Sequence, residues 1–75
     1  MKRINSKAVQ YLGVDIHITM PFVAVDEDGS LHEYAKEPSL RGSEWQLDPS
    51  RDYNFICEVD LEGFLWENTL RRFEI

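Results

Sequence analysis

Two stretches of this chain alternate apolar and polar side chains with a period of two. Val14–Thr19 is rich in β-branched residues, and Tyr53–Leu61 carries an apolar side chain at every second position. Successive side chains of a strand point to opposite faces of a sheet, so this alternation predicts two half-buried strands. A chain of 75 residues has room for only one hydrophobic core. We therefore expect one small domain built on these strands.

The segment that follows the first of these stretches is typical of a β-hairpin. Phe22–Val25 is apolar throughout, which predicts a strand buried on both faces, and Pro21 precedes it as a break because proline lacks a backbone donor. Asp26–Gly29 has turn chemistry, since aspartate and glycine tolerate left-handed backbone conformations. Ser30–Lys36 is the expected returning strand.

Residues 37–50 are expected to form a long loop. They contain two prolines, a glycine and three serines among few large apolar residues. We expect Leu40, Trp45 and Leu47 to hold this loop against the rest of the domain.

The last twelve residues, Phe64–Ile75, fit two patterns. Trp66, Leu70 and Phe73 have the spacing of a helical stripe. The alternative is a turn through Trp66–Asn68 and a closing strand from Thr69, with Phe73 and Ile75 on one face. The pattern does not decide between helix and strand.

Together these segments predict a mainly β fold. We expect a small antiparallel sheet of four or five strands, flat or curled into a partly open barrel, with at most one short C-terminal helix. Residues 1–7 are expected to be a flexible basic arm, and residues 8–75 a single β domain.

The cysteine content and the lack of a long apolar segment point to the cytoplasm. Cys57 is the only cysteine, so no intramolecular disulfide can form. No stretch approaches the roughly 20 apolar residues of a membrane helix, and the N-terminus lacks the apolar region of a signal peptide. We expect a cytoplasmic protein with no membrane association.

The charge of the chain is unevenly distributed. Its formal net charge is −6, but residues 8–70 hold 13 acidic and only three basic residues. Because nucleic-acid affinity rests on lysine and arginine that displace counterions, this balance makes nucleic acid an unlikely partner. A rigid array of carboxylates instead suits a basic protein, including a nucleic-acid-binding protein whose groove the acids would occupy.

No motif in the sequence supports catalysis or a metal site. The Asp26–Gly29 turn fails the calcium-loop spacing, because Ala24 and Ala35 fall where carboxylates are required. His17 and His32 are expected on polar sheet surfaces, and Cys57 in the core. We expect no enzyme activity, no cofactor and no metal.

The candidate partner-binding surface combines acids with an aromatic anchor. Tryptophan is a frequent anchor of protein interfaces, although Trp45 would equally serve to fold its loop over the core. The residues expected to bind a partner are Trp45, Asp26, Glu27, Asp28, Glu33 and Glu37.

The order of these features resembles that of small uncharacterised proteins of tailed bacteriophages and prophages. The shared pattern is an apolar strand, a D-x-D-G turn, a second strand ending near a proline, a tryptophan, and a terminal tryptophan followed by a leucine. Here the pattern comprises Phe22–Gly29, Tyr34, Pro38, Trp45, Trp66 and Leu70. The chain departs from it at Asn68–Thr69, where serine often precedes the leucine, and in its long loop. The resemblance implies a phage accessory protein in a bacterial cell, with no catalytic residues.

Two functions follow from these observations. The leading hypothesis is a non-enzymatic, phage-encoded accessory protein that binds a host or phage protein, as an inhibitor or a nucleic-acid mimic. The alternative is a small nucleic-acid-binding barrel with exposed rings as stacking platforms and basic termini as phosphate contacts. Edge strands and spare rings would also allow a homodimer. The residues of the alternative are Tyr34, Tyr53, Trp66, Lys2, Arg3, Lys7, Arg71 and Arg72.

Overall fold

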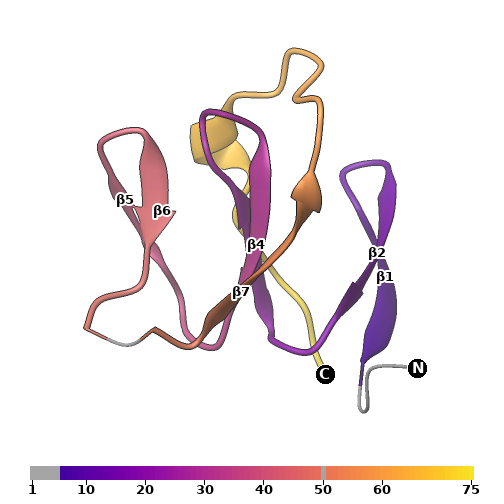
Figure 1. The fold of residues 1–75 in the computed structure, drawn as a ribbon. Helices are drawn as coiled ribbons and strands as arrows, with labels where there is room; N and C mark the ends of the chain where they lie inside the picture. Colours follow the sequence, from indigo (N-terminus) through magenta and orange to yellow (C-terminus); the bar gives the residue numbers. More distant parts are fainter. Residues whose placement is uncertain (1–5, 50) are drawn as a thin grey trace.

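A central antiparallel sheet of four strands carries a β-hairpin on each side (Figure 1). The computed structural model describes residues 6–49 and 51–75. The sheet has the order β7-β4-β3-β8, and the hairpins are β1–β2 and β5–β6. The elements are β1 (Lys7–Tyr11), β2 (Val14–Ile18), β3 (Phe22–Val25), β4 (Ser30–Tyr34), β5 (Ser39–Arg41), β6 (Glu44–Gln46), β7 (Tyr53–Glu58), the 3₁₀ helix η1 (Trp66–Asn68) and β8 (Arg71–Arg72).

The expected hairpin turn at Asp26–Gly29 is confirmed. The Gly29 N–H donates to the Asp26 carbonyl at 2.9 Å, and the Asp28 carboxylate accepts from the Ser30 N–H at 2.9 Å. These two bonds close the turn and set the register of β3 against β4, in which Val25 lies opposite Leu31.

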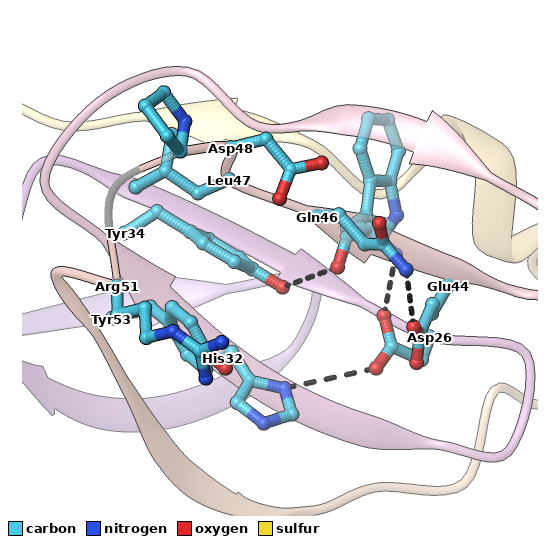
Figure 2. A pocket seen from close by; sticks show the side chains of 11 residues that line it. Asp26, His32, Tyr34, Glu44, Gln46, Leu47, Asp48, Arg51 and Tyr53 are labelled. Atoms are coloured by element: carbon cyan, nitrogen blue, oxygen red, sulfur yellow. Dashed lines mark hydrogen bonds and ion pairs between the residues drawn. The ribbon is translucent and has the colours of Figure 1, made fainter.

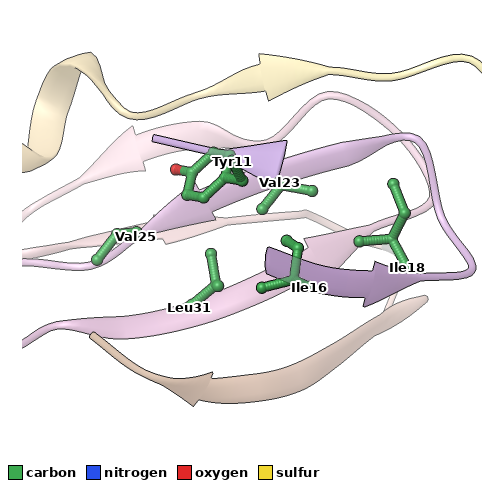
Figure 3. Close-up of a cluster of buried hydrophobic side chains, with 6 residues drawn as sticks. All are labelled: Tyr11, Ile16, Ile18, Val23, Val25 and Leu31. Carbon is green, nitrogen blue, oxygen red and sulfur yellow. The ribbon is translucent and has the colours of Figure 1, made fainter. Parts of the chain in front are cut away.

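The first hydrophobic cluster lies between the central sheet and the β1–β2 hairpin. Figure 3 shows its side chains converging from β1, β2, β3 and β4. Its buried members are Tyr11, Ile16, Ile18, Val23, Val25 and Leu31. Burial of these side chains is the main stabilisation available to a domain without disulfides.

The second cluster lies on the other face of the sheet, beneath the segment that contains β5 and β6. Ala24, Tyr34, Trp45 and Leu47 are buried there. The Trp45 ring meets Trp66 edge to face at a centroid distance of 6.5 Å. Because both faces of β3 are covered, its sequence is apolar without alternation, as predicted.

The expected loop at residues 37–50 is in part a hairpin, formed by β5 and β6. Trp45 and Leu47 are buried and hold this segment against the sheet as expected, whereas Leu40 is exposed and does not. The composition of this segment is typical of a loop, and its two strands have only three residues each, too few to show alternation.

A β-bulge divides the predicted strand at Tyr53–Leu61. Leu31 pairs with Cys57 but His32 pairs with Phe55, so Ile56 is an extra residue in β7. Cys57 therefore packs against the first cluster as expected, while Tyr53 and Phe55 turn to the opposite face. The prediction that all five apolar residues share one face was wrong, because a bulge reverses the alternation.

The C-terminal segment forms a short turn and a strand rather than a helix. η1 covers only Trp66–Asn68, and β8 pairs with β3. Thr69 lies between η1 and β8 and ties this segment to β3. Its hydroxyl accepts from the Val25 N–H at 2.9 Å and donates to the Trp66 carbonyl at 2.7 Å. The second of the two sequence alternatives is thus confirmed, although the strand is only two residues long.

The overall class was predicted correctly, since the fold is mainly β and antiparallel. The sheets of the described residues do not close into a barrel. Residues 1–5 of the expected N-terminal arm lie outside the described residues, and Lys7, its last residue, already belongs to β1.

The buried phenol of Tyr11 makes the fold sensitive to alkali. Its hydroxyl donates to the Thr69 carbonyl. Burial raises the pKa of Tyr11 from 10.0 to about 12 and outweighs the lowering effects of Thr69 and Arg71. The unfolded chain releases this proton first, so the contribution of Tyr11 to stability is complete below pH 10.0 and is lost as the pH rises towards 12. The loss corresponds to at most about 3 kcal/mol.

We expect Tyr11→Phe to have a shallower alkaline decline in its free energy of unfolding than the wild type. The variant should be about 1 kcal/mol less stable near neutral pH, because it lacks the hydroxyl hydrogen bond. Urea titrations at several pH values measure both effects. Equal alkaline declines in the two proteins would contradict this account of Tyr11.

Candidate functional site

The structure separates the six predicted partner-binding residues into two groups. Glu27, Asp28 and Glu37 are exposed. Asp26, Glu33 and Trp45 are buried, with Glu33 at 0% and Trp45 at 8% exposure. The six therefore do not form one continuous surface.

Trp45 is part of the core, the simpler of the two interpretations left open by the sequence. Its ring packs in the second cluster, and its indole N–H donates to the Trp66 carbonyl at 3.3 Å. Its backbone N–H donates to the Asp26 carboxylate at 2.8 Å. These contacts fix β6 to η1 and to the residue that follows β3, so the ring is turned inwards, although Trp45 still lines the pocket described below.

Glu33 binds the chain itself rather than a partner. One carboxylate oxygen accepts from the backbone N–H of Thr19 at 2.7 Å and of Met20 at 3.3 Å. The other accepts from the Thr19 hydroxyl at 2.9 Å and from the Asn54 side-chain amide at 3.0 Å. This carboxylate ties the β2–β3 connection and β7 to β4, which accounts for its complete burial.

The three acids of the Asp26–Gly29 turn lie where the tips of two hairpins meet, whereas Glu37 lies beyond β4, apart from them. The Glu27 N–H donates to the Ser43 carbonyl at 3.1 Å, which joins the β3–β4 turn to the β5–β6 turn. A depression of about 140 Å³ at this junction is lined by Asp26, Glu27, Asp28, Ser43 and Glu44. Folding of the long segment thus adds Glu44 to the predicted acidic turn.

A row of aromatic rings lies beside these acids on the face of β4 and β7. His32 contacts the rings of Tyr34, Tyr53 and Phe55 at centroid distances of 6.1, 5.9 and 5.5 Å. Tyr53 is 41% exposed and Phe55 is 57% exposed. Alternation predicted that both share a face with Cys57, and only the nucleic-acid-binding alternative named Tyr53 as an exposed ring. The bulge that turns them outwards has no sequence signal.

A pocket of about 330 Å³ opens between this aromatic row and the segment that contains β6. Its walls combine three carboxylates with four aromatic residues. In Figure 2 the carboxylates of Asp26 and Glu44 lie towards one end of the view and Arg51 and Tyr53 towards the other. The carboxylates are those of Asp26, Glu44 and Asp48, and the aromatic residues are His32, Tyr34, Trp45 and Tyr53.

Asp26 is the innermost acid of the pocket. Burial raises its pKa above the usual range, although the hydrogen bond from the Trp45 N–H acts in the opposite direction. Its second oxygen lies 3.8 Å from His32 Nδ1, too far for a hydrogen bond. That nitrogen is covered and has no hydrogen-bond partner among the described residues. The polar groups at this end of the pocket are therefore incompletely paired.

The cations near the pocket leave most of this negative charge uncompensated. Arg41 lies 3.7 Å from Asp48, and both side chains are exposed, so solvent weakens the attraction. Arg51 lines the pocket, but in the part of the chain that the structure describes no ion pair joins it to the three carboxylates. Asp26 and Glu44 thus have no lysine or arginine partner there.

A second pocket, of about 350 Å³, lies beside the first hydrophobic cluster and shares Tyr11 and Val25 with it. Its walls are mainly apolar and include Tyr11, Val14, Val59 and Phe64. The half-buried thiol of Cys57 also lines it.

Neither a metal-binding group among the described residues nor a comparison with known proteins indicates a function. Within residues 6–49 and 51–75, no group of three or more histidine, cysteine or acidic side chains is placed to hold a metal ion. The helical residues of the described chain form nothing long and apolar enough to cross a membrane. Comparisons with family models, curated proteins and solved structures found no match to this chain. Function must therefore be inferred from the surface itself.

Proposed function

We propose that this protein is a non-enzymatic binding module that engages a protein partner through an acidic aromatic face. This face comprises the pocket carboxylates, the acidic hairpin turn and the exposed rings of β7. The observation that carries the proposal is the pocket in which uncompensated carboxylates adjoin Tyr53, with Phe55 further along the same row of rings. The face comprises Asp26, Glu27, Asp28, Glu44, Asp48, Tyr53 and Phe55.

The charge of this face favours a basic partner. Carboxylates gathered on a rigid surface speed encounter with positive surfaces and repel acidic ones. A basic nucleic-acid-binding protein has the complementary charge. The resemblance to phage accessory proteins suggests the setting, a bacterial cytoplasm in which the partner is a host or phage protein.

The exposed rings supply the apolar part of such an interface. Aromatic side chains are enriched at protein interfaces because they bury a large area at low entropic cost. Tyr53 and Phe55 lie on β7, which is an edge strand of the central sheet. Since the pocket acids adjoin Tyr53, a basic protein fits this face better than a second copy of this acidic chain.

Charge reversal on the face should abolish partner capture. We expect the immobilised wild-type protein to retain a partner from bacterial lysate, and Glu44→Lys/Asp48→Lys to recover roughly tenfold less of it. The matched control is Asp15→Lys/Glu67→Lys, which makes the same change in net charge at exposed residues that line neither polar pocket.

Recovery of the partner by the control but not by the pocket variant would support the proposal. Equal losses in the two variants would show that only overall charge matters. Equal retention by all three proteins, or no retained protein at all, would also contradict it. Circular dichroism confirms that each variant is folded.

A further inference from the structure

We propose that the pocket between the β4–β7 face and β6 receives the guanidinium group of an arginine side chain presented by the partner. This inference rests on the proposed function and names the chemical group that the acidic aromatic face recognises. It follows from the placement of Asp26 and Glu44, the ring surface of Tyr53 and the size of the pocket.

The carboxylates at the inner end call for a cation. Asp26 is largely covered by protein, and Glu44 lines both the pocket and the acidic depression together with it. Two neighbouring carboxylates repel each other, and a guanidinium between them would relieve this repulsion while donating hydrogen bonds to both. Its several planar donors suit two acceptors better than the compact ammonium of lysine does.

The rings provide the second part of the recognition. Tyr34 and Tyr53 both line the pocket, with centroids 5.8 Å apart and planes inclined by 36°. Tyr53 is partly exposed, so part of its ring is free to be covered by a ligand. The apolar stem of an arginine whose guanidinium reaches Asp26 and Glu44 would pack on these tyrosine rings.

The volume of the pocket limits what it can admit. At about 330 Å³ it lies at the low end of small-ligand sites. It can admit one extended side chain but no helix or strand. The flanking peptide would remain outside, where Phe55 is exposed at the edge strand.

Arg51 provides an internal control. It lines the same pocket, so its positive charge should oppose the entry of a second cation. Neutralising Arg51 should therefore strengthen binding, whereas neutralising the carboxylates should weaken it. A merely structural role for these residues would not produce opposite effects.

Short capped peptides with one variable central residue between glycines and serines test the inference. The central residue is arginine, lysine or citrulline, the neutral analogue of arginine. We expect the arginine peptide to bind with a dissociation constant of about 1 mM and to shift the NMR signals of His32, Glu44 and Tyr53. Lysine should bind several-fold more weakly, and citrulline at least about tenfold more weakly.

Two variants and a control complete the experiment. Asp26→Asn/Glu44→Gln keeps an acceptor for the Trp45 N–H and should weaken arginine-peptide binding about tenfold. Arg51→Gln should strengthen it about twofold. Asp15→Asn/Glu67→Gln removes the same charge elsewhere and should change it less than twofold.

The assignment would be overturned if the arginine peptide bound no better than the citrulline or the lysine peptide. It would also be overturned by shifts at Val59 and Phe64, which line the other pocket. Free Nα-acetylarginine amide should bind more weakly than the peptide. Equal affinity would point to a small guanidinium compound and overturn a protein source. Loss of partner capture on Glu44→Lys/Asp48→Lys without arginine-peptide binding would leave the proposed function intact and refute only the guanidinium.

Discussion

Glu33→Ala should lose most of the stability of this domain. Its carboxylate is buried and accepts hydrogen bonds from Thr19, Met20 and Asn54. Alanine would leave these donors without a partner and open a cavity beneath the β2–β3 connection. Each buried donor left without a partner costs about 1–3 kcal/mol, so the total is a large part of the roughly 5–15 kcal/mol typical of a domain.

Urea unfolding followed by circular dichroism measures the loss, with two further variants for comparison. Glu33→Gln keeps the shape and one acceptor oxygen, so it should cost less, about 1–3 kcal/mol. Glu37→Ala removes an exposed carboxylate three residues beyond β4 and should change stability by under about 0.5 kcal/mol. A Glu33→Ala protein within 1 kcal/mol of the wild type would show that this carboxylate does not hold the fold together.

The burial of Glu33 also marks the limit of what its sequence pattern reveals. Alternation correctly places it on the face of Leu31, the buried face of β4. The sequence alone nevertheless suggests an exposed acid, because the donors that hydrogen-bond to this glutamate lie 14 and 21 positions away in the chain. Only the folded chain brings Thr19 and Asn54 to it. The same acidity that suggested a binding residue is a structural requirement here.

Strand periodicity predicted the sheet but not its faces at β7. Val14–Ile18, Phe22–Val25 and Ser30–Tyr34 are strands where the pattern placed them. In β7 one extra residue, Ile56, reverses the alternation and turns Tyr53 and Phe55 outwards. A bulge is specified by the register of two strands rather than by local composition. Alternation therefore placed these two rings on the same face as Cys57.

The acids of the site were predicted in part. Asp26 and Asp28 belong to a turn whose chemistry is local, so the sequence pattern located it correctly. Glu44 joins them only because β5 and β6 form a hairpin whose tip contacts Glu27. Trp45 anchors that hairpin from within, and this position both places its neighbour Glu44 at the pocket and leaves Trp45 in the pocket lining.

Gly29→Ala should be among the most destabilising single substitutions in the chain. Gly29 has a φ of +90°, a conformation that residues with a side chain rarely adopt, and a Cβ at this position would lie 2.5 Å from the Val59 carbonyl oxygen. The same backbone accepts a hydrogen bond from the Val59 N–H at 2.8 Å. Relieving the clash must therefore separate β7 from the β3–β4 turn. We expect a loss of about 3 kcal/mol or more.

Gly13→Ala separates the cost of the clash from that of the backbone conformation. Gly13 has a similar φ of +85°, but no atom lies within 4 Å of the position of an added Cβ. Its replacement should cost only about 1–2 kcal/mol, the expense of a left-handed conformation. Urea unfolding of both variants measures the difference. If the two lose equal stability, the close approach of Val59 contributes nothing, and the turn does not hold β7 in the position that exposes its aromatic rings.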